Sequence, residues 1–155
     1  MKVEYINPFL LAAKNVFSTM VGWEIERGQL YAKNGSEPEY EVSGIIGLSG
    51  RAVGTVVLSL SREAAFQATK ALLGEECTEL DATVVDAVGE LANMVAGSAK
   101  SQLEQFKMSI SIPTVITGKG YQVQFPKDVP RICIPFNCLA GPMCLEVGFR
   151  ENTSG

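Results

Sequence analysis

The spacing of apolar positions along the chain has a helical period in three stretches. It predicts helices over 7–22, 61–74 and 81–106. Asn7 is a suitable N-cap for the first helix, and Pro8 suits the first helical position because its missing N–H would be unpaired there anyway. Ser61 and Asp81 are expected to begin the other two helices, and Gly22 is placed to end the first.

The rest of the chain is rich in β-branched residues and is typical of strands. Strands are predicted over 23–32, 40–48, 52–60, 107–118, 131–139 and 143–150, and the short run 121–125 is a further candidate. Ser49 and Gly50 can turn a hairpin between the second and third of these runs. In the fourth run, Met108, Ile110 and Ile112 should share one face of a strand.

The order of these elements predicts an α+β fold. A helix followed by antiparallel strands occurs twice, which indicates a degenerate internal repeat. Strands in runs and helices in pairs favour two layers, with long helices packed on an antiparallel β-sheet. No linker divides the chain, so we expect a single domain over 1–150 and a flexible tail over 151–155.

Length and charge limit the function classes. The chain has 155 residues and a net charge of −4, and its 13 basic residues are scattered, so nucleic-acid binding is not expected. No apolar run approaches the ~20 residues of a membrane helix, and the N-terminal pattern is unlike a signal peptide. We therefore expect a cytoplasmic protein that does not bind membranes.

The residues that usually carry metal and acid–base chemistry are scarce. The chain has no histidine, and its four cysteines form no C-x-x-C pair. The cysteines are Cys77, Cys133, Cys138 and Cys144. Reduced structural thiols explain them better than a zinc site does.

The third predicted helix has an unusual polar stripe. At about 100° per residue, one side of the helix is broadly apolar, and the opposite side holds Asp86, Glu90, Asn93, Gly97, Lys100 and Glu104. A plain solvated face is the simplest explanation. However, Gly89 and Gly97 each cost a helix interior about 1 kcal/mol relative to Ala, and they let another backbone approach closely. A helix that contains destabilising glycines where another backbone can approach it is typical of a docking surface.

At this stripe the sequence resembles a known family. The run 86–100, DAVGELANMVAGSAK, resembles the signature of the CheC/CheX/FliY chemotaxis phosphatases, in which an acidic or Ser residue precedes E-x-x-N on a long helix. The opening run and the later SISIPTVITG are similar to the CheX branch. There are two departures. Pro113 lies nearer to Asn93 than in the CheC-like pattern, and Ala12 stands where a second site on the first helix, with Asn15, would need glutamate.

The resemblance implies a phosphatase that hydrolyses the aspartyl phosphate of a CheY-like response regulator. In this reading the amide of Asn93 positions the attacking water, and Glu90 anchors the protein to a lysine of the partner's active site. Further residues expected to extend the docking contacts are Asp86, Gly89, Gly97 and Lys100. The protein needs no cofactor of its own, and Mg²⁺ is expected on the partner.

Three other readings stay open at this stage. One is a response-regulator-binding module of the same fold that does not catalyse hydrolysis. Another is a component related to the flagellar-switch phosphatases, whose additional domain has no room in 155 residues. The last is an unrelated small-ligand domain, for which Gly118-Lys119-Gly120 lacks the spacing of a P-loop and is better explained as a turn.

The strand-rich region from Arg131 to Phe149 predicts assembly. Its apolar strands would leave at least one sheet edge open, and open edges pair with other chains. The resemblance also points to a homodimer. We expect sheet edges to join the two copies and the Glu90–Asn93 faces to remain outside, with a monomer guarded by charges such as Arg150 as the alternative.

Overall fold

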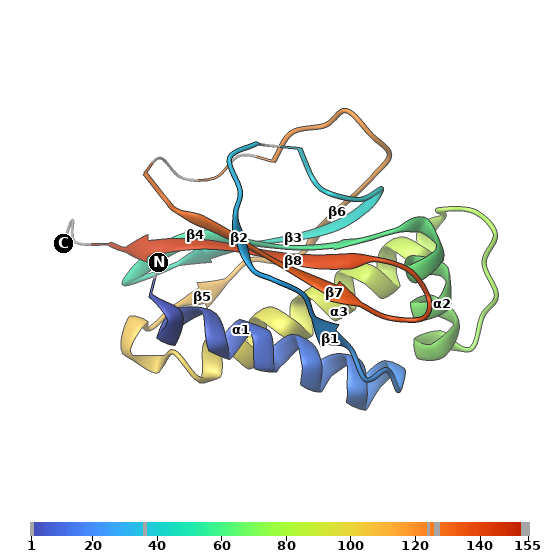
Figure 1. Cartoon of the computed structure of the whole chain (residues 1–155), viewed down its shortest axis with the longest axis horizontal. Coiled ribbons are helices and arrows are strands. Elements are labelled where there is room, and N and C mark those ends of the chain that lie inside the picture. The colour runs from blue at the N-terminus through green and yellow to red at the C-terminus, as the bar shows by residue number, and fades with distance from the viewer. Residues whose placement is uncertain (1, 36, 124, 126–127, 153–155) are drawn as a thin grey trace.

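A computed structural model describes residues 2–35, 37–123, 125 and 128–152 of the chain (Figure 1). Its helices are α1 (Val3–Val16), α2 (Arg62–Leu73) and α3 (Ala82–Ser101), with a π-helical turn, Phe17–Val21, after α1 and a 3₁₀ turn, Glu104–Phe106, after α3. None of the helices in these described ranges is both long and apolar enough to cross a membrane.

The strands form one antiparallel sheet. They are β1 (Glu26–Arg27), β2 (Tyr31–Ala32), β3 (Val42–Ser49), β4 (Ala52–Leu60), β5 (Ser109–Ile110), β6 (Thr114–Thr117), β7 (Arg131–Asn137) and β8 (Met143–Glu151). Their order is β1-β7-β8-β4-β3-β5, with β2 also on β7 and β6 also on β3. The predicted α+β fold with helices on an antiparallel sheet is confirmed.

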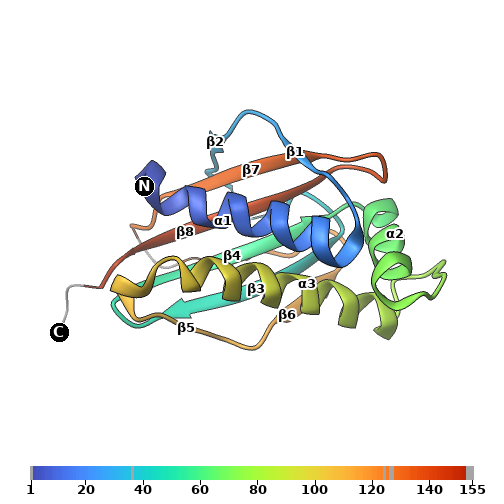
Figure 2. The same ribbon diagram turned by 90° about the horizontal axis from the view of Figure 1, so that it is seen from below.

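Two helices cover one face of the sheet. Figure 2 shows α1 and α3 side by side across the strands, with α2 at one end. α3 packs very closely on β3, because a Cβ added to Gly44 would lie 2.8 Å from the Cβ of Ala92 and 3.4 Å from the carbonyl oxygen of Val88. Val88, Leu91 and Val95 on the sheet side of α3 are fully buried. This contact fixes which side of α3 faces solvent.

The predicted end signals of α2 and α3 are present. The Ser61 hydroxyl accepts a hydrogen bond from the N–H of Ala64 at 3.3 Å. The Asp81 carboxylate accepts hydrogen bonds from the N–H groups of Thr83 and Val84 at 3.1 and 3.3 Å. These caps satisfy amides that have no partner within the helix.

The prediction that Asn7 caps the first helix is wrong. α1 begins at Val3, and Pro8 lies inside it. The extra turn is stabilised by packing, since the ring of Tyr5 lies 5.1 Å from that of Phe106 and 5.6 Å from that of Phe149. Tertiary contacts of this kind outweigh the hydrogen bond that a proline removes.

The predicted end of the third helix is also wrong. α3 stops at Ser101, five residues before the expected end at 106. The backbone leaves the helical region at Leu103, and the 3₁₀ turn then brings Phe106 into the core. Burial of Leu103 and Phe106 explains why the chain bends there instead of continuing straight.

The predicted strand over 107–118 is broken into β5 and β6. Met108 is buried and Ile110 is half-buried, but Ile112 is exposed, so the three residues do not share one buried face. Pro113 cannot donate to a strand ladder, which explains why regular pairing stops before it. Ser111 still bonds Gly47 of β3 through its N–H, but the segment Ser111–Pro113 is not part of a strand, and regular pairing resumes at β6.

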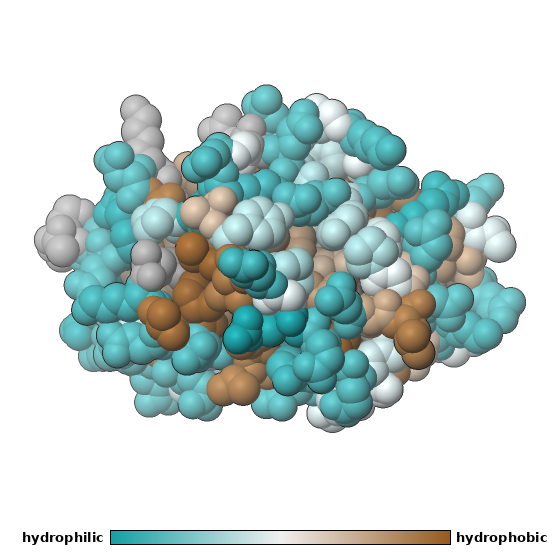
Figure 3. Space-filling view, viewed as in Figure 1, coloured by the Kyte–Doolittle hydropathy of each residue, from teal (hydrophilic) through white to brown (hydrophobic). Residues whose placement is uncertain are grey.

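The prediction that Arg131–Phe149 leaves an open sheet edge is wrong. β8 lies between β7 and β4, and the outer edge of β7 is covered by residues 26–33. The N–H of Gly28 bonds the carbonyl of Pro135 at 2.8 Å, which fills the gap between β1 and β2. On the side of the molecule where β1, β2 and α1 lie, hydrophilic residues predominate, and apolar residues appear in several separate places (Figure 3).

The segments 121–125 and 151–155 also differ from the expectations. Tyr121–Val123 do not form the candidate strand over 121–125, whose residue 124 lies outside the described residues. The expected tail, 151–155, begins at the last residue of β8, and Asn152 donates a backbone hydrogen bond to Arg51 at 2.7 Å. Residues 153–155 lie outside the described residues.

The sheet face opposite the helices carries a buried ion pair. The Nζ of Lys33 lies 2.7 Å from Oε1 of Glu146 and 3.2 Å from Oε1 of Glu39. The Lys33 and Glu146 side chains are 8% and 2% exposed. Burial raises the pKa of Glu146, although Lys33 acts in the opposite direction. The pair therefore fastens the segment after β2 to the centre of the sheet.

We predict that Lys33→Met lowers the free energy of unfolding by about 3–5 kcal/mol, because it leaves a buried carboxylate without its counter-charge. Without Lys33 the pKa of Glu146 rises further, so the carboxyl takes up a proton as pH falls. The loss should therefore be smaller near about pH 5 than near about pH 8. Urea unfolding at both pH values measures it.

The matched control is Lys33→Met combined with Glu146→Leu. Removing both charges should recover most of the lost stability. Equal losses in the single and double variants would show that the ion pair does not account for the effect.

Candidate functional site

The polar stripe lies along the solvent side of α3, as predicted. Asp86, Glu90 and Lys100 are exposed, and Asn93 and Gly97 are half-buried. The stripe faces solvent because the capped helix buries its apolar side against β3 and α1 and leaves the opposite side uncovered. Glu104 lies beyond the helix, in the 3₁₀ turn.

Glu90 and Asn93 are adjacent on this stripe. Among the residues that the structure describes, neither side chain makes a hydrogen bond or an ion pair. Their positions are three apart in a helix, so their side chains lie on the same side. A carboxylate and a carboxamide are thus presented together to solvent, where another protein can contact both.

Gly89 has a different role from the predicted one. It is buried, and a Cβ at this position would lie 3.3 Å from Val115 Cγ2 and 3.5 Å from Pro113 Cγ. The close approach that the glycine permits is therefore made by this chain's own β6 region. Its assignment as a docking residue is corrected, because a partner cannot reach it.

Gly97 lies at a shallow hollow near the C-terminal end of α3. The hollow has a volume of about 340 Å³, and its lining includes Gly97, Lys100, Glu104 and Lys107. A Cβ at Gly97 would have only Ile110 Cδ1 near it, at 3.9 Å. Gly97 and Lys100 are therefore accessible from solvent, and they stay in the predicted docking set.

The segment Ser111–Pro113 borders the stripe, which was not expected from the sequence. We expected a regular strand there, whereas the segment bulges beside α3 between β5 and β6 (Figure 2). Pro113 was the available signal, because proline in a strand pattern indicates a bulge or an edge. The surface around Glu90 and Asn93 is thus formed by two elements.

α1 cannot hold a second site of the same type. Ala12 is only 3% exposed and lies in the core, while Asn15 is exposed. A glutamate at position 12 would place its carboxylate among apolar side chains. The single site expected from the sequence agrees with this packing.

The cysteines lie away from the stripe and are all free. Cys133 and Cys144 are buried on neighbouring strands, on the sheet face away from the helices. Contact with Cys133 and burial raise the pKa of Cys144 well above its ordinary value, so this thiol stays protonated. Within the described ranges, no three His, Cys, Asp or Glu side chains are grouped in a way that would hold a metal ion.

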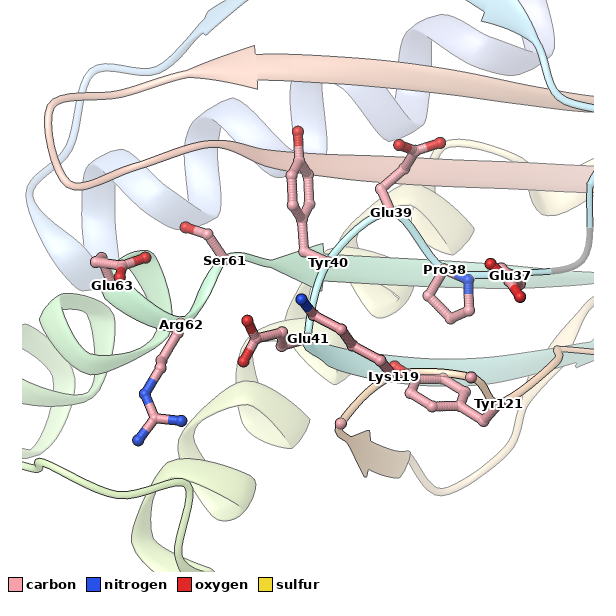
Figure 4. Close-up of a pocket in the computed structure, with 12 residues that line it drawn as sticks. Glu37, Pro38, Glu39, Tyr40, Glu41, Ser61, Arg62, Glu63, Lys119 and Tyr121 are labelled. Carbon is pink, nitrogen blue, oxygen red and sulfur yellow. The ribbon is translucent and has the colours of Figure 1, made fainter.

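A second hollow, of about 350 Å³, lies where β3 begins and β4 ends (Figure 4). Side chains of both charges line it, and Figure 4 shows Glu41 close to Lys119 while Arg62 points away. Gly118 and Gly120 have φ of 107° and 82°, which fits the predicted turn. Its mixed charges give no reason to place phosphate chemistry there.

The family follows from comparison with known proteins. The family model described as chemotaxis phosphatase CheX matches residues 42–137, which include all of α3. This chain belongs to the CheX family. The CheY-P phosphatase CheX of Thermotoga maritima is 27% identical over 127 residues, which cover 80% of this chain and 82% of that protein.

Solved structures of a CheC-like protein and of a CheX protein have the same fold. A CheC-like superfamily protein from Shewanella sp. PV-4 matches with a TM-score of 0.87 and 32% identity, covering 97% of this chain and 99% of that one. The CheX–CheY–BeF3–Mg²⁺ complex from Borrelia burgdorferi matches with a TM-score of 0.80 and 28% identity, covering 97% of this chain and 100% of that one.

We predict that Ala12→Glu destabilises this CheX-family chain by about 3 kcal/mol or more, because the new carboxylate has no buried counter-charge. Thermal and urea unfolding measure the loss. Leu11→Glu is the matched control, since Leu11 is 58% exposed and the added charge stays in water. If both variants are equally stable, position 12 has room for a second acidic group.

Proposed function

We propose that this protein hydrolyses the aspartyl phosphate of a CheY-like response regulator. In the reaction, a water oxygen forms a bond to phosphorus as the bond between phosphorus and the aspartyl oxygen breaks. The aspartate carboxylate leaves with the electron pair, the water loses a proton, and inorganic phosphate is released. Membership of the CheX family supports this assignment.

One observation carries the proposal. Glu90 and Asn93 lie one turn apart on the solvent side of α3, and neither has a partner within the described chain. Unpaired polar groups on an open helix face suit a substrate that is itself a folded protein. A deep pocket for a small molecule is not required.

Asn93 is the proposed catalytic residue. Its amide oxygen can accept a hydrogen bond from the attacking water, and the group carries no charge that would repel the phosphoryl oxygens. An acyl phosphate is already reactive, so a 100-fold acceleration requires only about 2.7 kcal/mol of transition-state stabilisation. One well-placed carboxamide is sufficient for an effect of this size.

Glu90 is the proposed anchor. Its negative charge is unsuited to contact with a phosphoryl group, but it can pair with a lysine in the partner's active site. Asp86, Gly97 and Lys100 extend the docking surface along the same stripe. The protein contributes no cofactor in this proposal, and Mg²⁺ is bound by the response regulator, in line with the Mg²⁺ in the Borrelia burgdorferi CheX–CheY complex.

A non-catalytic binding module of the same fold is the alternative. Release of inorganic phosphate from phosphorylated receiver domains of the same organism, with and without this protein, separates the two functions. Catalysis requires faster release at substoichiometric amounts of the protein. Binding without acceleration would favour the alternative.

The proposal keeps the homodimer and the cytoplasmic location expected from the sequence. A symmetric dimer has the favourable base rate, but the region Arg131–Phe149, which was expected to leave a sheet edge open, has the outer edge of β7 occupied by residues 26–33. Light scattering across a dilution series tests the assembly. A particle of 16.6 kDa throughout the series would rule out the dimer.

We predict that Asn93→Ala lowers the rate of dephosphorylation by about 100-fold while partner affinity changes little, because the variant loses only the group that positions the water. Single-turnover phosphate release and a binding titration measure the two quantities. Wild-type turnover in this variant would remove Asn93 from the catalytic role.

We predict that Glu90→Lys weakens partner binding by about tenfold or more at low salt, because it reverses a charge that meets a lysine. The effect should decrease as salt screens the exposed pair. Titration at two salt concentrations measures it. Glu75→Lys, in the exposed α2–α3 connection, makes the same change in net charge and should bind like the wild type. Equal losses in both variants would indicate a general charge effect.

A further inference from the structure

Ile112 is exposed although its backbone is firmly held. It is 85% exposed, in a chain whose isoleucines are otherwise buried or half-buried. The N–H of Gly47 donates to the Ser111 hydroxyl at 2.8 Å, and the N–H of Ser111 donates to the Gly47 carbonyl at 2.9 Å. The Ser111 hydroxyl in turn donates to the carbonyl of Ile112 at 2.9 Å. These bonds hold Ile112 in a fixed place on the outside of the protein.

The position of Ile112 relative to Asn93 follows from two contacts. A Cβ at Gly97 would face Ile110, and a Cβ at Gly89 would face Pro113 and Val115. Asn93 lies one turn from each glycine, on the same side of α3. It therefore faces the middle of the connecting segment, between Ile110 and Pro113. Figure 2 shows this segment passing along α3 on the side away from α1.

We propose that Ile112 is a docking residue for the phosphorylated receiver domain, where it packs on apolar surface beside the phosphorylated aspartate. This inference rests on the proposed function. The contact is continuous with the Glu90–Asn93 stripe, so the receiver that presents its phosphoryl group to Asn93 also covers Ile112. The polar stripe orients the partner, and the isoleucine keeps it in place long enough for the water to attack.

The two kinds of contact differ in their response to salt. An ion pair made by Glu90 weakens as ionic strength rises, because both charges are screened. Burial of an isoleucine involves no charge and does not weaken in this way. Loss of the Ile112 contact should therefore have the same effect at low and high salt, unlike the Glu90 reversal.

The experiment compares wild type, Ile112→Ser, Ile112→Leu and Leu139→Ser. Leu139 is fully exposed in the β7–β8 turn, and β3 and β4 lie between β6 and β8 in the sheet, so Leu139 is the matched control. Two readouts are used: steady-state phosphate release from the phosphorylated receiver, and affinity for the receiver activated with beryllofluoride and Mg²⁺. Thermal unfolding checks that all four proteins are folded.

The proposal expects a selective loss of binding. Ile112→Ser should raise KM and Kd by about tenfold, equal to about 1.4 kcal/mol, at both salt concentrations, with kcat changed by less than about twofold. Ile112→Leu should restore most of the affinity, and Leu139→Ser should behave like the wild type.

Several outcomes would overturn the proposal. These are unchanged KM and Kd in Ile112→Ser, an equal loss in Leu139→Ser, or a halved particle mass in Ile112→Ser, which would show that a second copy of the chain covers this residue. If the wild type binds the activated receiver without accelerating phosphate release, the proposed phosphatase activity fails, while the Kd values still test Ile112. If the wild type neither binds nor hydrolyses, both proposals fail.

Discussion

The close contact of α3 with β3 determines the rest of the arrangement. Gly44 has no side chain, and a Cβ added at this position would lie only 2.8 Å from the Ala92 methyl group. Because the helix lies this near to the sheet, its apolar side is buried against β3, α1 and α2, and its polar stripe must face solvent. A larger residue at position 44 would push the helix away from the sheet and turn the stripe. The site thus depends on packing at a residue that never contacts the partner.

The chemistry that this surface can carry is modest, and it suits the substrate. Neither Glu90 nor Asn93 has a supporting hydrogen bond from within the described chain. Enzymes that activate a nucleophile need such support, because the nucleophile, base and orienting group must be aligned. An acyl phosphate is already reactive, and in the proposed reaction the response regulator binds the Mg²⁺. The protein then needs to supply only a water-binding group and a well-defined approach.

The sequence predicted the features that depend on local rules. Ser61 and Asp81 cap their helices, and the stripe through Glu90 and Asn93 follows from helical periodicity alone. The failures depend on contacts between distant parts of the chain. α1 extends before Pro8 because Tyr5 packs on Phe106 and Phe149, and no local signal reports that contact. The side of the site formed by Ser111–Pro113 was missed because alternating apolar residues there imitate a strand.

Because residues 26–33 cover β7, the parts of this protein must fold in a certain order during synthesis. Among the residues that the structure describes, β1 and β2 pair with β7 alone, about a hundred residues later in the chain. β7 in turn needs β8, whose other neighbour is β4. The β3–β4 hairpin can form as soon as it leaves the ribosome, whereas the region between α1 and β3 must wait until β7 has been synthesised. During that time its backbone amides are satisfied by water, and the half of the molecule that holds α3 can already be in place.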